Sequence, residues 1–245
     1  MTIEVILFII AGAVCGGFVN GLAGFGTSLF ALGWWLQVLP PLQAVALSFV
    51  MSVLGSIPGI VLVWRYITWR RLARFLIPAL LGIPVGLAVL HRIDAASLTI
   101  ALAAFLLLYG GFFSFRRGLP TIVRPTPIID LMVGFLGGVC GAIAGLSGVL
   151  PTIWCSLRAW PKAEQRAVLQ PYNVIILSLS ALSLALDGNY DRNVLLTIVA
   201  ALPATLISAL IGIQVFKRLN DAQFRRLLII LMLVSGLSLL IRIAW

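Results

Sequence analysis

Charged residues are scarce in this 245-residue sequence, of which they make up only 10%. A soluble domain carries about 25% charged residues, so this chain has too little polar surface to cover a globule in water. Hydrophobic residues make up 62% of the chain, and its mean hydropathy is +1.15. The composition excludes a soluble protein and predicts an integral membrane protein whose surroundings are the lipid bilayer.

The residue types that most often carry out chemistry are also rare. The chain has one histidine and three cysteines, and the cysteines all lie in apolar runs, so neither a metal site nor a disulfide framework is expected. The seven acidic residues lie at or near the ends of apolar segments, and we expect no buried carboxylate that carries protons. Phosphate-binding and nucleophile motifs are absent. We therefore expect no catalytic residue, no metal and no cofactor, and we predict that the protein is not an enzyme.

Long apolar runs fill most of the chain. They lack the alternation of polar and apolar residues that barrel strands show, so the sequence predicts an all-α membrane protein. A spanning helix needs about 20 residues. The first and fifth runs are longer and rich in glycine. The eight apolar segments are 3–32, 42–64, 72–90, 96–115, 128–157, 166–186, 193–215 and 224–244.

The two halves of the chain repeat each other. At an offset of 121 residues, Gly16, Gly17, Ala23 and Gly24 coincide with Gly137, Gly138, Ala144 and Gly145. Pro40 likewise coincides with Pro161. We predict a first membrane repeat at 1–118, a cytoplasmic linker at 119–127 and a second membrane repeat at 128–245.

The distribution of Lys and Arg predicts the topology. If all eight segments cross the membrane, nine of the 17 basic residues fall on one side and eight on the other, which is no bias. If the first and fifth segments are re-entrant hairpins, fourteen fall on one side and three on the other. This predicts two inverted repeats, each a glycine-broken hairpin plus three transmembrane helices. The basic loops are then cytoplasmic and both termini lie outside. The alternative is a plain eight-helix bundle with parallel repeats.

The net charge of +10 has two compatible explanations. The first is the excess of basic residues that cytoplasmic loops carry, and the second is an electrostatic funnel for anions. The basic residues lie at helix ends rather than along one stripe, so no nucleic-acid partner is expected.

The glycine clusters of the first and fifth segments are the best candidates for a binding site. Interrupted segments at matching positions in two halves indicate where a transporter binds its substrate, and half-helix N-termini offer N–H groups to anions. The alternative is that the glycines only allow close helix packing. The predicted substrate-binding residues at the two tips are Gly24, Gly26, Thr27 and Ser28, and Gly145, Ser147 and Gly148.

Polar residues beside the tips extend the candidate site. Asn20 either hydrogen-bonds the substrate or caps a half-helix. Ser52 belongs to a face of serines spaced by four residues, and it coincides with Asn173 at the offset of 121. Gln170 and Asn173 are costly to bury unless they are paired, which favours an inward, functional position for both. Asn20, Ser52, Gln170 and Asn173 complete the predicted substrate-binding set.

Several stretches resemble the sulfite exporter TauE/SafE family of membrane permeases. They are Gly17…Gly21-Leu22-Ala23-Gly24-Phe25-Gly26, Pro40…Ala46…Ser48, Ile67-Thr68-Trp69-Arg70 and, in the second half, Gly138…Ala144-Gly145-Leu146-Ser147-Gly148…Pro161. The resemblance implies transport of sulfur-containing anions, such as sulfite, sulfonates or sulfoacetate, across the bacterial inner membrane.

These observations together predict a secondary transporter for a small anion, a sulfur oxyanion or an organosulfonate, which works by alternating access. The alternative is a passive anion channel of the same architecture. The sequence leaves open whether copies of the chain assemble into a homo-oligomer.

Overall fold

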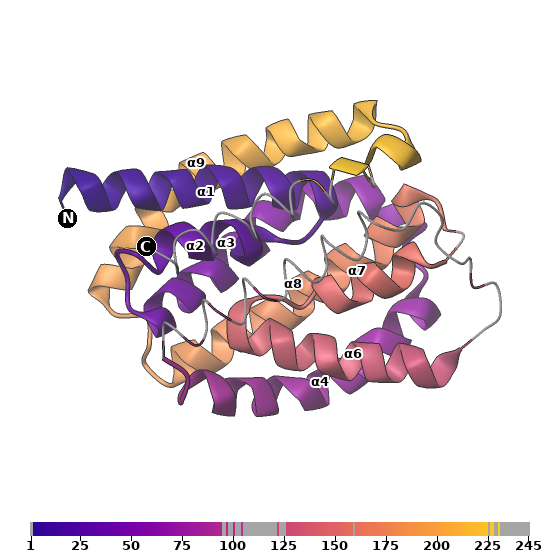
Figure 1. Ribbon diagram of the computed structural model, residues 1–245, viewed down its shortest axis with the longest axis horizontal. Coiled ribbons are helices and arrows are strands. Elements are labelled where there is room, and N and C mark those ends of the chain that lie inside the picture. Colours follow the sequence, from indigo (N-terminus) through magenta and orange to yellow (C-terminus); the bar gives the residue numbers. More distant parts are fainter. Residues whose placement is uncertain are drawn as a thin grey trace.

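The computed structural model describes residues 2–94, 97, 100, 104, 122, 126–158, 160–224, 226, 227 and 230. This part of the chain is helical and contains no strand. Most of the predicted segments 96–115 and 224–244, and of the predicted linker 119–127, lies outside the described residues. The helices are α1 (Ile3–Ala23), α2 (Thr27–Trp35), α3 (Pro41–Val63), the 3-10 turn η1 (Trp64–Tyr66), α4 (Trp69–Leu90), α6 (Pro127–Ala144), α7 (Val149–Ser156), α8 (Lys162–Leu186) and α9 (Arg192–Arg218) (Figure 1).

Six of these helices are long and apolar enough to cross a membrane, namely α1, α3, α4, α6, α8 and α9. Their starts follow ordinary capping chemistry. Pro41 and Pro127 open α3 and α6 at the first helical turn, where a missing N–H costs nothing. The Asp191 side chain accepts a hydrogen bond from the Val194 N–H at 2.8 Å and caps α9. The prediction of a multi-pass, all-helical membrane protein is therefore confirmed.

Two pairs of helices pack closely through glycines. Along α1 and α9, Gly17 faces Thr205 and Gly21 faces Ala209, so the two helices run parallel. A methyl group on Gly21 would lie 1.9 Å from the carbonyl oxygen of Ala209. Small residues let membrane helices approach this closely, and the gain is van der Waals contact between backbones.

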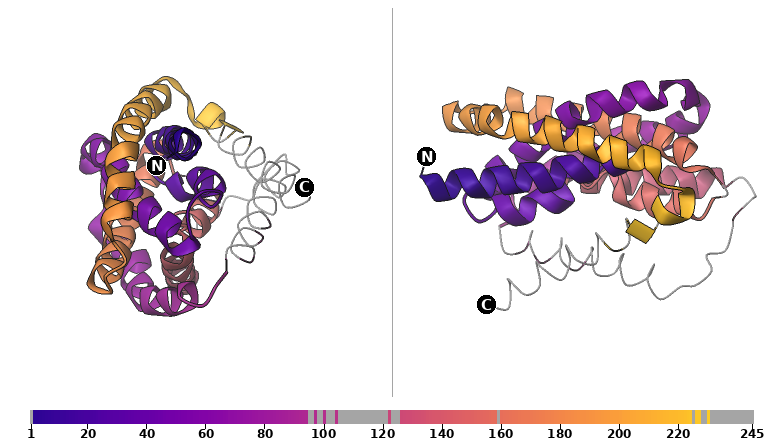
Figure 2. Two further views of the ribbon diagram at one scale, coloured as in Figure 1. Left: turned by 90° about the vertical axis from the view of Figure 1, so that its left-hand side faces the viewer. Right: turned by 90° about the horizontal axis from the view of Figure 1, so that it is seen from above.

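The second pair repeats this arrangement. Gly82 of α4 faces Phe135 of α6, and Gly86 faces Val139, so these helices are also parallel. From the other side, a methyl group on Gly138 would lie 2.3 Å from the carbonyl oxygen of Ala79. The end view in Figure 2 shows the bundle formed by these pairs and the helices between them.

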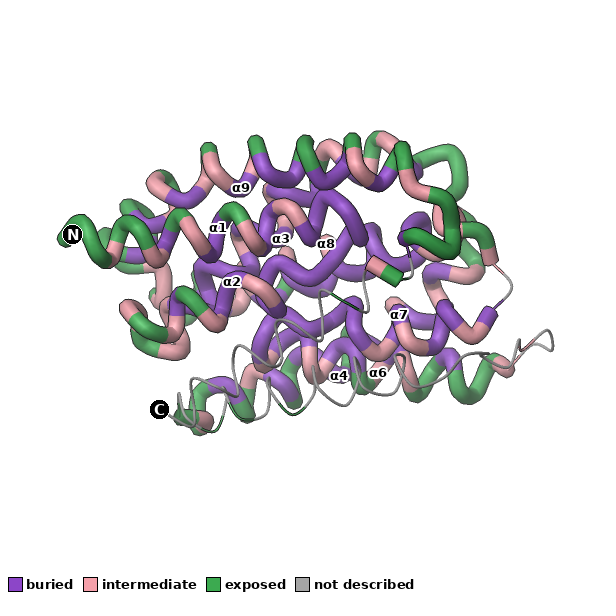
Figure 3. The backbone as a smooth tube through the Cα atoms, turned by 45° about the horizontal axis from the view of Figure 1, so that its top comes forward, coloured by how far each residue is buried: buried purple, intermediate pink, exposed green. Residues whose placement is uncertain are grey.

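Helices α3 and α8 lie between the two pairs and run antiparallel. The Gln170 amide donates to the carbonyl of Ser56, and the Tyr190 hydroxyl, beyond the end of α8, donates to the carbonyl of Ala46. The colours in Figure 1 show that α1, α3 and α9 run in one direction and α4, α6 and α8 in the other. Inner turns of α1, α3 and α8 form a continuous buried core (Figure 3).

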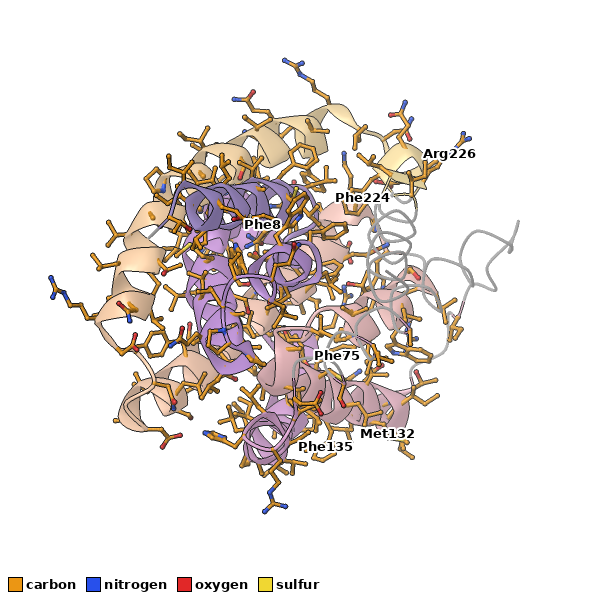
Figure 4. All side chains as sticks on the ribbon, turned by 60° about the vertical axis from the view of Figure 1, so that its left-hand side comes forward. Phe8, Phe75, Met132, Phe135, Phe224 and Arg226 are labelled. Atoms are coloured by element: carbon orange, nitrogen blue, oxygen red, sulfur yellow. The ribbon has the colours of Figure 1, made fainter. Side chains whose placement is uncertain are left out.

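The outer faces of the bundle are apolar. On α4, Ile77 is 63% exposed and Leu81 is 68% exposed, as expected for side chains that face lipid. Figure 4 contrasts two labelled residues: Met132 lies at the periphery, whereas Phe75 points to the inside and is fully buried. Inside the bundle, the fully buried Trp35 donates its indole N–H to the carbonyl of Ile9 at 3.0 Å.

Candidate functional site

The first glycine cluster breaks the helix at the predicted place. Helix α1 ends at Ala23 and α2 begins at Thr27. Between them Gly24 has φ +83° and Gly26 has φ +98°, a left-handed region that residues with a Cβ rarely adopt. The Gly24 N–H donates to the Asn20 carbonyl and closes α1. Helix α2 then turns back along α1, since Gly12 contacts Trp35 and Gly16 contacts Thr27.

The second cluster breaks the chain in the same way. Helix α6 ends at Ala144, with Gly145 at φ +70° as its C-cap, and α7 begins at Val149. Gly148 has an ordinary φ of −79°, so its conformation does not require glycine. A methyl group at Gly148 would instead lie 2.6 Å from the Phe25 ring of the first tip. Glycine is therefore needed at 148 for space and at 145 for conformation.

The two tips touch each other, although 121 residues separate them in the sequence. Phe25 packs against Gly148, and a methyl group on Gly145 would lie 1.9 Å from the Ser28 hydroxyl oxygen. Figure 1 shows the short helices α2 and α7 between the lines of α1 and α6. The predicted tip residue Gly26 is the exception, because its neighbours are Val19 and Leu29 of its own hairpin.

The glycines have two structural roles, each at different positions. Gly17 and Gly21 lie within regular helix and let α9 approach α1. Gly24, Gly26 and Gly145 instead make the helix breaks, because each has a positive φ.

One polar network joins α1, α3 and α8 beside the first tip. The Asn20 amide donates to the Ser52 carbonyl at 2.9 Å, and its oxygen accepts from the Ser56 hydroxyl at 2.9 Å. The Gln170 amide donates to the Ser56 carbonyl at 2.8 Å. The Asn20 side chain thus bonds to α3 and does not cap a half-helix.

A second set of contacts lies beside the second tip. The Ser28 hydroxyl donates to the Ser48 hydroxyl at 3.0 Å. The Ser147 hydroxyl donates to the Asn173 carboxamide oxygen at 2.5 Å. Asn173 and Ser28 are both fully buried, so these contacts are shielded from water. The structure therefore places all the predicted residues at the two tips and on the helices beside them, although the neighbours of Gly26 belong to its own hairpin.

Three buried polar atoms of the predicted residues have no hydrogen-bond partner. They are the Thr27 hydroxyl, the Ser52 hydroxyl and the Asn173 amide nitrogen. A buried donor without a partner is costly, and such atoms are rare in native proteins. Ser52 and Asn173 are the pair matched by the offset of 121, and the antiparallel α3–α8 contacts place them at similar levels. These atoms are the donors that a bound ligand would satisfy.

Arg166 is the residue that the sequence reasoning missed. It starts the apolar run 166–186, and we counted it among the cytoplasmic loop residues. Arg166 is a helix residue rather than a loop residue, because α8 begins four residues earlier, at Lys162, and Arg166 is only 1% exposed. Its Nε donates to the Gln170 carboxamide oxygen at 2.8 Å. The spacing of four residues between Arg166 and Gln170, which places them on one helix face, is the signal that was available.

One acidic residue is buried, near the end of an apolar segment as predicted. Asp130, in the first turn of α6, is only 6% exposed. It accepts from the Trp154 indole N–H at 2.6 Å and from the Arg158 guanidinium at 3.2 Å. The return of α7 along α6 brings Trp154 and Arg158 over a carboxylate that would otherwise lie at a helix end. Asp130 is an ion-pair partner rather than a free acid.

Comparisons with known proteins support one family. No curated protein and no solved structure matches the chain. The model of the sulfite exporter TauE/SafE family matches residues 8–239, which include both glycine clusters and all of the described helices except the first turns of α1. The chain therefore belongs to the sulfite exporter TauE/SafE family of membrane transporters.

Proposed function

We propose that this protein is a secondary transporter that moves a small anion across the bacterial inner membrane by alternating access. The proposed substrate is a sulfur oxyanion or an organosulfonate, such as sulfite or sulfoacetate. Membership of a sulfite exporter family supports the substrate class. The observation that carries the proposal is the contact between two glycine-broken tips, which are surrounded by buried donors without partners.

The chemistry of the tips favours an anion over a cation. Thr27 is the first residue of α2, so its hydroxyl lies beside N–H groups that have no partner within the helix. The N-terminal end of a helix also carries partial positive charge. Asp130 is the one acidic residue among the buried side chains that the structure describes, and it is paired with Arg158. The tips offer donors and no free carboxylate.

We further propose that the two halves are inverted repeats, each with a re-entrant hairpin and three transmembrane helices. Exchange of the halves turns the α1–α9 pair into the α6–α4 pair, and both pairs are parallel and packed through glycines. Each helix of the first half also runs opposite to its counterpart in the second half (Figure 1). The third transmembrane helix of each repeat is expected at 96–115 and 224–244, most of which lies outside the described residues.

The proposed orientation places the basic loops in the cytoplasm and both termini outside. If the buried Arg158 and Arg166 are left out of the count, twelve basic residues still fall on the proposed cytoplasmic side and three on the other. A reporter fused after Leu39, in the connection between α2 and α3, is expected to lie outside. A reporter fused after Arg70 or Arg71 is expected to lie inside. An inside location after Leu39 would contradict the hairpin and favour eight simple crossings.

Alternating access would come from one repeat rocking against the other around the touching tips. The proposal includes no proton coupling, because no free buried carboxylate lies at the tips. Export of an anion down the membrane potential is physically sufficient, since one charge moved through 100 mV releases about 2.3 kcal/mol.

Counterflow in proteoliposomes tests the function. Vesicles loaded with unlabelled methanesulfonate, a singly charged organosulfonate, are expected to accumulate labelled methanesulfonate transiently, and the flux should saturate. Thr27→Val should lower this flux about tenfold or more, because a hydrogen bond to a charged group is lost. Thr197→Val is the matched control, since that buried hydroxyl only donates to the carbonyl of Asn193 within α9. Unitary currents without counterflow would favour the passive channel instead.

A further inference from the structure

We infer that Arg166 supplies the positive charge that holds the transported anion, and that the site consequently prefers a singly charged anion to a doubly charged one. This inference rests on the proposed transport function. It adds to the proposed site a residue that the glycine pattern does not indicate. It also specifies that the preferred substrate carries a single negative charge.

Arg166 is a buried charge without a counter-charge. Three charged side chains are buried in the part of the chain that the structure describes, namely Asp130, Arg158 and Arg166. Asp130 and Arg158 form an ion pair with each other at 3.2 Å. No acidic group of the described residues forms an ion pair with Arg166. Buried charges are normally paired, because removal of an ion from water is costly.

The neighbours of the guanidinium are neutral. Its Nε donates to the Gln170 carboxamide oxygen at 2.8 Å, and its Nη1 donates to the Leu22 carbonyl at 3.2 Å. The Phe216 ring lies 4.5 Å from the guanidinium carbon. The Nη2 atom is buried and has no hydrogen-bond partner. A guanidinium with a free N–H is well suited to an oxyanion, because its donors form a planar fork that matches oxygen pairs.

Glycines on two sides make room for this guanidinium at the first tip. A methyl group on Gly59 of α3 would lie 2.6 Å from Nη2, and one on Gly24 would lie 3.2 Å from Arg166 Cγ. Through Gln170 the guanidinium joins the network of Ser56 and Asn20. The charge is thus connected to the polar residues of the tip by direct hydrogen bonds.

The other charged side chains near the start of α8 already have partners. Glu164 accepts from Arg71 of α4 at 2.8 Å, in an ion pair whose side chains are 30% and 40% exposed. Lys162 donates to the carbonyl of Phe216 at 3.1 Å, near the end of α9. Arg166 therefore contributes one net positive charge to the interior. A single negative charge neutralises it, whereas a dianion leaves a net negative charge in the same low-dielectric surroundings.

A purely structural role for Arg166 is the competing explanation. Leu22 lies in the last turn of α1, where carbonyls lack helical partners, and a cation at a helix C-terminus is stabilising. Glutamine at position 166 retains an amide donor for this carbonyl but carries no charge. Arg166→Gln therefore distinguishes the two roles, because it removes the charge but retains a donor for the helix end.

The test measures anion binding to the purified full-length protein by calorimetry. The probes are methanesulfonate and sulfate, which are close in size and shape but differ by one charge. Wild-type protein is expected to bind methanesulfonate at least tenfold more tightly than sulfate. Arg166→Gln should weaken methanesulfonate binding by about thirtyfold or more. Arg166→Lys, which keeps the charge, should recover much of that loss. Arg70→Gln, which removes an exposed arginine, is the matched control and should bind like wild type.

The outcomes separate this inference from the proposed function. If wild-type protein shows counterflow and Arg166→Gln binds methanesulfonate as wild type does, the assignment of Arg166 is overturned while the transport function stands. If wild-type protein neither binds nor transports any anion, the proposed function itself fails. If Arg166→Gln does not fold, the wild-type comparison still decides, because sulfate binding as tight as methanesulfonate binding overturns the single-charge assignment.

Discussion

Replacement of Asp130 by alanine is expected to lower the free energy of unfolding by about 3–5 kcal/mol, because it removes the carboxylate that forms an ion pair with the buried Arg158 guanidinium. The Asp130 and Arg158 side chains are only 9% and 6% exposed. The change also removes the acceptor of the Trp154 indole N–H, which lies 2.6 Å from the carboxylate. Equilibrium unfolding in mixed detergent micelles measures the loss, and the fraction of monodisperse protein reports whether the variant folds.

An exposed ion pair provides the control for this prediction. Glu164→Ala removes the partner of Arg71, but those side chains are 30–40% exposed. Solvent screens such pairs, so the expected loss is at most about 1 kcal/mol. A second comparison uses Asp130→Leu combined with Arg158→Met, which should be less destabilising than Asp130→Ala alone because no charge stays buried. A loss at Asp130 no larger than the loss at Glu164 would show that the buried pair does not stabilise the second hairpin.

Replacement of Gly21 by alanine is expected to destabilise the protein by about 1–3 kcal/mol or more, although alanine is the better helix former. The added methyl group would lie 1.9 Å from the Ala209 carbonyl oxygen and 2.7 Å from its Cα. Both are backbone atoms of α9, so the clash cannot be relieved by a change of rotamer. The helices must separate, and the close packing along α1 and α9 is lost.

Gly55→Ala is the matched control, because Gly55 is also a helical glycine of the core. A methyl group there would lie 3.2 Å from the Asn20 amide nitrogen and 3.2 Å from the Thr205 methyl carbon. Both neighbours are side-chain atoms that can move by a few tenths of an ångström. The gain in helix propensity, about 1 kcal/mol, should then leave Gly55→Ala close to wild type. Equal losses at Gly21 and Gly55 would show that backbone proximity to α9 is not what constrains Gly21.

Much of the fold follows from patterns that are local in the sequence. Apolar runs bounded by proline and charged residues correspond to α3, α4, α8 and α9 within a few residues. The helix breaks at Gly24–Gly26 and at Gly145–Gly148 were predictable as well, because consecutive glycines weaken a helix and permit a positive φ. The duplication of these breaks at an offset of 121 residues predicted two matched tips, which touch each other in the structure.

The charges of the interior were harder to predict, because their burial depends on neighbours far away in the chain. Arg166 is buried by the first tip and by Phe216 of α9, and neither lies near it in the sequence. Asp130 is buried by Trp154 and Arg158, which reach it only because α7 turns back along α6. A basic residue at the start of an apolar run gives the same sequence signal whether it faces cytoplasm or protein.

The sequence by itself determined that this protein is a helical membrane protein with two glycine-broken segments, because hydropathy and backbone freedom are local properties of the residues. Only the tertiary structure decided that the two breaks touch, that Asn20 bonds to α3, and that Arg166 lies unpaired beside them. The physical reason is that a buried contact requires both of its partners in place, and here the partners are separated by up to 144 residues of chain.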